Sequence, residues 1–210
     1  MKNIFKLKFF ILFLYCIILL SPQIYSKESD SKKSKNLKSN AAISKIRPEK
    51  WAQKIEISGL PNFHKVSDAL YRGAQPDKKG MEELKKMGIK TIINLRTFHS
   101  DRDEIDTMNF NYIPISAQAW KTKEKVVLNF LKTVTDTENQ PVFVHCQHGA
   151  DRTGTMCAIY RIAVQNWTKE DAIEEMVNGG FGYHTVWKNL ISYIKKVNIE
   201  KLQKKSGIKN

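Results

Sequence analysis

One stretch decides the fold of this chain: His145-Cys146-Gln147-His148-Gly149-Ala150-Asp151-Arg152-Thr153-Gly154. It follows a short apolar run, Val142-Phe143-Val144, and leads into a helical pattern that continues to Val164. Its residues therefore lie where the first backbone N–H groups of a helix have no intrahelical partner, and such a turn binds anions. We predict that Gln147 to Arg152 form a phosphate-binding loop between a buried strand and a helix.

The residue types in this stretch point to nucleophilic chemistry at phosphorus. Cys146 lies among the unpaired N–H groups, which should lower the pKa of its thiol below the usual value of about 8.5 and make it a nucleophilic thiolate. Arg152, in the first helical turn, offers a planar fork for two phosphoryl oxygens. Gly149 permits a tight turn with close backbone approach. Thr153 can donate its hydroxyl to the sulfur, and His145 is expected to orient the loop from behind.

With five residues between its Cys and its Arg, this stretch resembles the signature of the cysteine-dependent protein tyrosine phosphatases: His-Cys, five residues, Arg, then Ser or Thr. The chain is similar to the small dual-specificity members, and to bacterial exported ones in particular, over about residues 62–194. Two further stretches carry the resemblance, Leu70-Tyr71-Arg72-Gly73-Ala74-Gln75-Pro76 and Gly88-Ile89-Lys90-Thr91-Ile92-Ile93-Asn94-Leu95-Arg96. The resemblance implies the dual-specificity phosphatase fold, a cysteinyl-phosphate intermediate and no metal or organic cofactor.

One feature of the family is missing from this chain. The resemblance implies an Asp that gives the leaving oxygen its proton from a loop before the Cys, yet no Asp occurs between Asp106 and Asp136. Glu124 lies on the corresponding loop. Asp151 lies where phosphoinositide phosphatases of the myotubularin and Sac types carry an acidic residue. The remaining choices come from an earlier loop and are Asp101, Asp103, Glu104 and Asp106. Each of these carboxylates also has a structural or solvated interpretation, so the sequence leaves the general acid open.

Alternating strand and helix patterns predict an α/β fold with a central, mostly parallel sheet flanked by helices, and a site at the carboxyl ends of the strands. Two short strands are predicted around Ser67-Asp68 within residues 62–72, and others at 89–95, 112–115 and 142–144. Pro114 favours an edge position or a strand end for the predicted strand 112–115. Helices are predicted at 77–87, 126–134, 153–164, 168–178 and 186–197 from apolar spacing and terminal signals. His64 and His184 are interpreted as residues of core or surface packing.

The first 50 residues differ in composition from the rest. Residues 1–26 combine early lysines, an apolar run from Phe9 to Leu20 and a short polar end, which is the layout of a signal peptide. The run is shorter than the roughly twenty residues that span a bilayer. We therefore predict an exported protein, periplasmic or secreted, with an uncleaved anchor to the inner membrane as the alternative. Residues 27–50, rich in Ser, Lys and Asn, are predicted to be a disordered basic linker, and residues 51–210 the phosphatase domain.

The net charge of +14 favours anionic partners. These are a phosphorylated substrate or, through the basic linker, a membrane surface, although abundant lysine also serves solubility. No nucleic-acid-binding motif is visible, so nucleic acid is not an expected partner. Of the three cysteines, Cys16 lies in the predicted signal peptide. Cys157 is interpreted as a buried packing residue and not as a thiol that forms a disulfide with Cys146.

The predicted function is that of a protein tyrosine or dual-specificity phosphatase whose substrates are phosphotyrosine proteins. One alternative is a phosphoinositide or inositol phosphate phosphatase, which Asp151 and the lysine surplus favour. The other is a phosphate-binding module that the missing Asp has made weakly catalytic. The intact Cys146 and Arg152 argue against the module.

Overall fold

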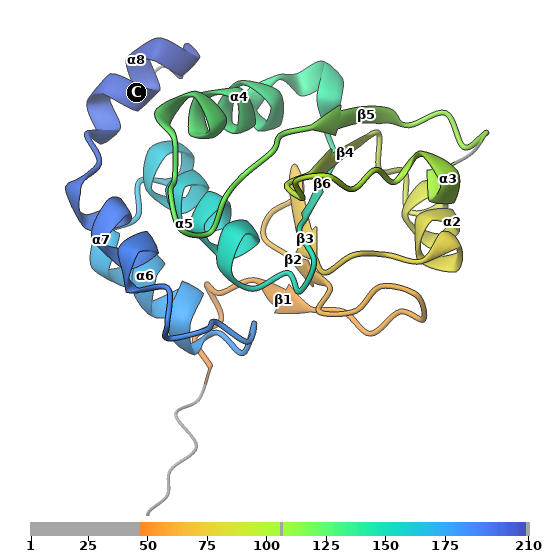
Figure 1. Ribbon diagram of the computed structural model, residues 1–210, viewed down its shortest axis with the longest axis horizontal. Coiled ribbons are helices and arrows are strands. Elements are labelled where there is room, and N and C mark those ends of the chain that lie inside the picture. Colours follow the sequence, from red (N-terminus) through yellow and green to blue (C-terminus); the bar gives the residue numbers. More distant parts are fainter. Residues whose placement is uncertain (1–46, 106, 209–210) are drawn as a thin grey trace, which may run out of the picture. The chain divides into compact units, whose positions relative to one another are not determined.

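Six strands form one sheet in the order β1-β2-β3-β6-β4-β5 in a computed structural model that describes residues 47–105 and 107–208 (Figure 1). The strands are β1 (Gln53–Lys54), β2 (His64–Lys65), β3 (Leu70–Gly73), β4 (Thr91–Asn94), β5 (Asn111–Pro114) and β6 (Val142–His145). Strands β3, β6, β4 and β5 pair in parallel, whereas β1 and β2 are antiparallel. The predicted α/β fold with a mostly parallel sheet is confirmed.

The two inner strands of the parallel part of the sheet, β6 and β4, are buried along their whole length, which explains their mostly apolar residues. Every residue of β4 and β6 is buried, as expected for parallel strands with both faces covered. Alternate side chains point to opposite faces: Ile92 and Phe143 join one apolar cluster, while Ile93 and Val144 join another. Strand β5 lies at the edge, so the prediction made from Pro114 is confirmed.

Helices cover both faces of this sheet (Figure 1). One face carries α2 (Lys78–Lys86) and α3 (Arg102–Ile105), which pack on Ile92 and Phe143. The other face carries α4 (Glu124–Thr135) and α5 (Asp151–Gln165). Around α5 pack α6 (Lys169–Asn178), α7 (Lys188–Lys196) and α8 (Ile199–Ser206). A short 3₁₀ helix, η1 (Thr137–Asn139), precedes β6.

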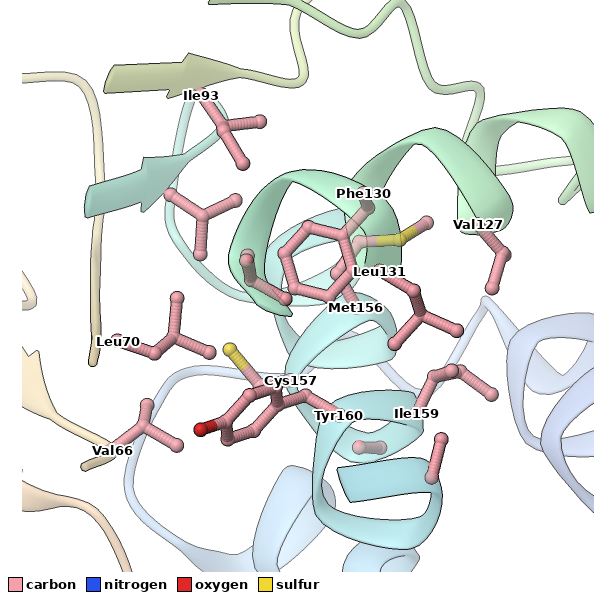
Figure 2. Close-up of a cluster of buried hydrophobic side chains, with 14 of the residues drawn as sticks. Val66, Leu70, Ile93, Val127, Phe130, Leu131, Met156, Cys157, Ile159 and Tyr160 are labelled. Atoms are coloured by element: carbon pink, nitrogen blue, oxygen red, sulfur yellow. The ribbon is translucent and has the colours of Figure 1, made fainter. Parts of the chain in front are cut away.

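Helix α5 is the centre of the larger cluster. Twelve of its residues are buried, because sheet and helices enclose it. At Gly154 an added Cβ would lie 2.9 Å from Met176 Cγ, so glycine allows the close approach of α6. Figure 2 shows Cys157 among the apolar side chains of this cluster. Its prediction as a buried packing residue is confirmed.

Local signals explain several helix boundaries. Thr168 caps α6 by accepting a hydrogen bond from Asp171 N at 3.0 Å, as its sequence predicts. The last predicted helix, 186–197, is wrong in detail, because Val186 lies outside α7 and is 74% exposed. The chain bends after α7, and Asn198 caps the separate helix α8 by accepting a hydrogen bond from Lys201 N at 2.8 Å.

The amino-terminal boundary of the compact unit is Arg47. The guanidinium of Arg47 donates hydrogen bonds to Gly179 O, and Lys50 forms an ion pair with Asp171 at 3.0 Å. The end of the predicted linker 27–50 is therefore part of the domain. The predicted signal peptide or anchor, and the rest of the linker, lie outside the described residues. Within residues 47–105 and 107–208, no helix has the length and apolar character needed to cross a membrane.

Candidate active site

The predicted phosphate-binding loop connects the central strand β6 to the start of α5. Strand β6 ends at His145, and α5 begins at Asp151, so Cys146 to Ala150 form the connection. Because β6 runs parallel to β3 and β4, the loop lies at the carboxyl edge of the sheet. The first N–H groups of a 15-residue helix point toward this edge. The predicted strand, loop and helix sequence is confirmed.

Gly149 makes the loop compact. Its backbone is left-handed, with φ of 69°, and an added Cβ would lie 2.5 Å from the carbonyl of Gly73. The loop also accepts a hydrogen bond at Gln147 O from Gln75 N, at 3.2 Å. A side chain at position 149 would therefore force the loop away from the end of β3.

Arg72 on β3 holds the loop through a hydrogen bond to its backbone. Its side chain is only 1% exposed, and its Nη2 donates to Gly149 O at 2.5 Å. The guanidinium carbon lies 3.7 Å from the centre of the Phe181 ring, a cation–π contact. The sequence motif that contains Arg72 did not predict this role. An arginine within a short, largely buried strand is the feature of the sequence that could have indicated it.

The predicted nucleophile and its predicted helpers lie together at this loop. Cys146 is 2% exposed, while Arg152 Nη1 lies 3.5 Å from Leu95 O and its side chain lines a neighbouring cavity. Thr153 Oγ1 is buried and has no hydrogen-bond partner among the described residues. The Thr153 hydroxyl is thus free to donate a hydrogen bond to Cys146 Sγ, and that hydrogen bond stays a prediction.

His145 takes part in a buried hydrogen-bond chain behind Cys146. His145 Nε2 lies 2.8 Å from Asp101 Oδ2, and both side chains are fully buried. Gln75 Nε2 donates to Asp101 Oδ1 at 2.6 Å, and Gln75 Oε1 accepts a hydrogen bond from Arg96 Nη1 at 3.1 Å. Burial alone would raise the pKa of Asp101, but hydrogen bonding and the charge of His145, with the Gln75 hydrogen bond, hold it below its usual range. Asp101 is therefore an ionised group that positions His145, not an exposed proton donor.

Glu124, the first acid candidate from the sequence, forms ion pairs with α8. Its carboxylate lies 2.7 Å from Lys205 Nζ and 3.0 Å from Lys201 Nζ. The hydrogen bonds from Lys205 and Lys201 lower the pKa of Glu124, whereas a general acid must hold its proton near neutral pH. Sequence reasoning did not include this contact because it did not predict α8. Asp103 and Glu104 lie on α3, and Asp106 lies outside the described residues.

Asp151, the second acid candidate from the sequence, is paired with a histidine. Its Oδ1 accepts a hydrogen bond from His184 N at 2.9 Å, and its Oδ2 lies 2.8 Å from His184 Nδ1. The His184 ring centre lies 5.7 Å from that of His148 on the catalytic loop. The interpretation of His184 as a core or surface packing residue does not include this pairing; the His184 side chain is 50% exposed. A glycine-rich segment, Gly179-Gly180-Phe181-Gly182, precedes His184 and was the signal that could have drawn attention to it.

A cavity of about 260 Å³ opens beside Arg152. Its lining includes Thr155 and Met156 of α5. Three lysines, Lys121, Lys123 and Lys125, also line it. Its chemistry suits an anionic group next to the catalytic loop. Among the described residues, no group of three His, Cys, Asp or Glu side chains could hold a metal ion.

The sequence matches a phosphatase family model and known phosphatases. Residues 56–186 match the family model described as DSP-PTPase phosphatase fused to NAD+ kinase. The chain is 30% identical to the dual specificity protein phosphatase TpbA of Pseudomonas aeruginosa, over 78% of this chain and 74% of that protein. It is 28% identical to the inositol diphosphatase DSP5 of Arabidopsis thaliana, over 55% of this chain and 60% of DSP5.

A solved structure gives the same result. The chain superimposes on a Cys-to-Ser variant of Pseudomonas aeruginosa TpbA in complex with phosphotyrosine, with a TM-score of 0.69 and 29% identity. The superposition covers 77% of this chain and 99% of that one. Family model, relative and structure all cover the loop that carries Cys146 and Arg152. The chain therefore belongs to the dual-specificity branch of the cysteine-dependent protein tyrosine phosphatases.

Proposed function

We propose that this enzyme hydrolyses phosphotyrosine in proteins through a cysteinyl-phosphate intermediate. The observation that carries the proposal is the placement of Cys146 and Arg152 on one loop, at the carboxyl end of a central strand and the start of a buried helix. The phosphotyrosine complex of the similar TpbA variant supports the choice of substrate.

The mechanism follows from the groups at the loop. The Cys146 thiolate attacks phosphorus in line, an S–P bond forms, and the bond from phosphorus to the tyrosyl oxygen breaks. The loop N–H groups and the Arg152 guanidinium bind the non-bridging oxygens, where negative charge must be stabilised in the transition state. The leaving oxygen takes a proton. Water then attacks phosphorus, the S–P bond breaks, and phosphate and the thiolate are released.

The test compares phosphotyrosine peptide hydrolysis by the wild-type chain with that by Cys146→Ser and Arg152→Lys. Cys157→Ala is the matched control, because Cys157 is a free cysteine of helix α5 that lies outside the phosphate-binding loop. We expect Cys146→Ser to abolish turnover, and acid-quenched wild-type enzyme to carry phosphate on Cys146. Arg152→Lys keeps the charge but loses the planar fork and should lower kcat/KM by at least about 10²-fold. Binding of the peptide by wild-type protein without turnover would contradict the proposal and favour the phosphate-binding module.

A second candidate function is the hydrolysis of inositol phosphates, and the lysine-lined cavity beside Arg152 favours it. A substrate with several phosphate groups could place one on the catalytic loop and another against Lys121, Lys123 and Lys125. The similarity to the inositol diphosphatase DSP5 supports the same alternative. Replacing the three lysines by Ala would raise KM for a polyphosphorylated inositol far more than for a neutral phosphotyrosine peptide. Equal effects on both substrates would exclude a dedicated second phosphate site.

We also propose that the enzyme works outside the cytoplasm. The support is the composition of residues 1–26, which combines early lysines with a short apolar run. Fractionation of cells that express the full chain, with mass measurement of the mature amino terminus, tests this. A mature chain that starts near residue 27 in the periplasm or the medium is expected. A full-length chain in the membrane fraction would support the anchor, and a full-length cytoplasmic chain would contradict export.

A further inference from the structure

The proposed reaction needs a proton for the leaving tyrosyl oxygen, and two of the acid candidates, Glu124 and Asp101, are held by other side chains. No Asp occurs between Asp106 and Asp136. Glu124 is bound by two lysines of α8, and Asp101 is buried against His145. A tyrosyl oxygen is a poor leaving group without protonation, because its conjugate acid has a pKa of about 10. A proton donor at the rim of the catalytic loop would therefore accelerate the first step.

We infer that His184, oriented by Asp151, is the residue that transfers this proton. This inference rests on the proposed phosphatase function. Asp151 holds His184 at two points, through the backbone N–H and through ring Nδ1. This is the arrangement in which a carboxylate fixes the tautomer of a catalytic histidine and stabilises its protonated form. With Nδ1 directed at Asp151, Nε2 is the nitrogen that remains for a substrate.

The position of His184 supports this role. Asp151 is the last residue before Arg152, so its partner is tied directly to the phosphate-binding loop. The His184 ring lies 5.7 Å from the ring of His148, a loop residue. Asn62 Nδ2 donates to His148 O and to Phe181 O, both at 2.9 Å, and thereby holds the loop and the segment before His184 together. The side chain of His184 is half-exposed and thus accessible to a leaving group that departs from the loop toward solvent.

The proton inventory balances in both steps. In the first step, the imidazolium donates the Nε2 proton to the tyrosyl oxygen while the P–O bond breaks and the S–P bond forms. His184 is then neutral. It keeps the proton on Nδ1, and this N–H donates a hydrogen bond to Asp151. In the second step, neutral Nε2 takes a proton from the attacking water while the new O–P bond forms and the S–P bond breaks. The enzyme returns with a protonated His184 and a thiolate at Cys146.

The test uses the leaving-group dependence of the first step. Full-length wild type, His184→Gln and Asp151→Asn are assayed with phosphotyrosine peptide, phenyl phosphate and p-nitrophenyl phosphate. Loss of a general acid removes about 10²- to 10⁴-fold of rate when the leaving oxygen is basic. We expect His184→Gln to lower kcat/KM by that factor for the first two substrates and by less than about 10-fold for p-nitrophenyl phosphate. Asp151→Asn should show the same selectivity with a smaller loss.

Controls separate a chemical role from a structural one. Thermal unfolding verifies that each variant folds, and His99→Gln, an exposed histidine of another loop, is the matched substitution. Equal losses on all three substrates would mean that His184 only shapes the site, and the inference would be wrong. It would also be wrong if Glu124→Gln showed the selective loss and His184→Gln did not. Absence of turnover by the wild type on every substrate would instead reject the proposed function itself.

Discussion

Arg72 shows how one buried side chain can determine the shape of a catalytic loop. Its guanidinium is enclosed between β3 and Phe181 and donates to Gly149 O, the carbonyl at the tightest point of the loop. Because Gly149 contacts the backbone of Gly73, the carbonyl has little freedom to find another donor. Arg72 is thus a positioning residue that acts through the loop and not on the substrate.

We expect Arg72→Met to reduce both stability and activity. The substitution leaves a buried carbonyl without its donor, which costs about 1–3 kcal/mol of unfolding free energy. Displacement of the loop by even a fraction of an ångström should lower kcat/KM by roughly 10- to 100-fold. Urea unfolding and phosphotyrosine hydrolysis measure the two effects. The control is Arg102→Met, since Arg102 is exposed; wild-type kcat/KM in Arg72→Met would contradict the positioning role.

The two cysteines of the described region should differ sharply in reactivity. Burial raises the pKa of the Cys157 thiol to about 11, so at neutral pH it is protonated and enclosed by the core (Figure 2). Iodoacetamide at pH 7 is expected to modify the peptide that contains Cys146 and to leave the peptide that contains Cys157 unmodified. Peptide mass analysis after brief labelling measures this. Equal labelling of both peptides in folded protein would show that the core around α5 opens readily.

At the scale of secondary structure, ion pairs join helices in two different environments. Arg161 of α5 and Glu175 of α6 form a buried pair, with Nη2 and Oε1 2.7 Å apart and side chains 3% and 4% exposed. Glu175 Oε1 also accepts a hydrogen bond from Ala52 N at 2.6 Å. The pair between Glu124 of α4 and Lys205 of α8 is exposed by comparison. The first links three segments in the interior, and the second links two helices at the surface.

We expect Glu175→Ala to lower the free energy of unfolding by about 3–5 kcal/mol, because it leaves the Arg161 charge buried without a partner. Lys205→Ala breaks the surface pair and should cost less than about 1 kcal/mol. Chemical denaturation of the two variants beside the wild type gives both values. Similar losses in the two variants would show that burial does not determine the contribution of these pairs.

The elements that the sequence predicts well have a clear apolar run, a regular apolar stripe or a recognisable motif. Strands β4 and β6 are short buried runs, α4 buries a regular stripe, and α5 follows the phosphate-binding motif, so these patterns are visible without tertiary information. Helix α3 has only four residues, and β1 only two exposed ones; both exist because of neighbouring segments. Within the site, Cys146 and Arg152 were predictable from spacing. The pairing of Asp151 with His184 was not, because it joins residues 33 positions apart through a loop.

At the scale of the whole molecule, one buried histidine links the fold to pH. His64 on β2 is 2% exposed, its Nδ1 lies 3.0 Å from Asn62 O, and its ring packs edge-on against Phe181. Desolvation by burial lowers its pKa from 6.5 to about 4, and the charges of Arg72 and Arg47 act in the same direction. The folded domain therefore keeps His64 neutral at a pH where the unfolded chain protonates it.

The sign of the pH effect follows from this difference. Between about pH 6.5 and pH 4 the unfolded chain binds a proton that the folded chain does not. The His64 contribution to stability is thus complete above pH 6.5 and is lost as the pH falls, by up to about 1.4 kcal/mol per pH unit. His64→Asn keeps a donor for Asn62 O but cannot titrate. The stability difference between wild type and His64→Asn, measured by urea unfolding at pH 7.5, 6, 5 and 4.5, should therefore move steadily in favour of the variant. Parallel stability curves for the two proteins would show that His64 has the same pKa in the folded and unfolded states, which its burial and the nearby charges of Arg72 and Arg47 argue against.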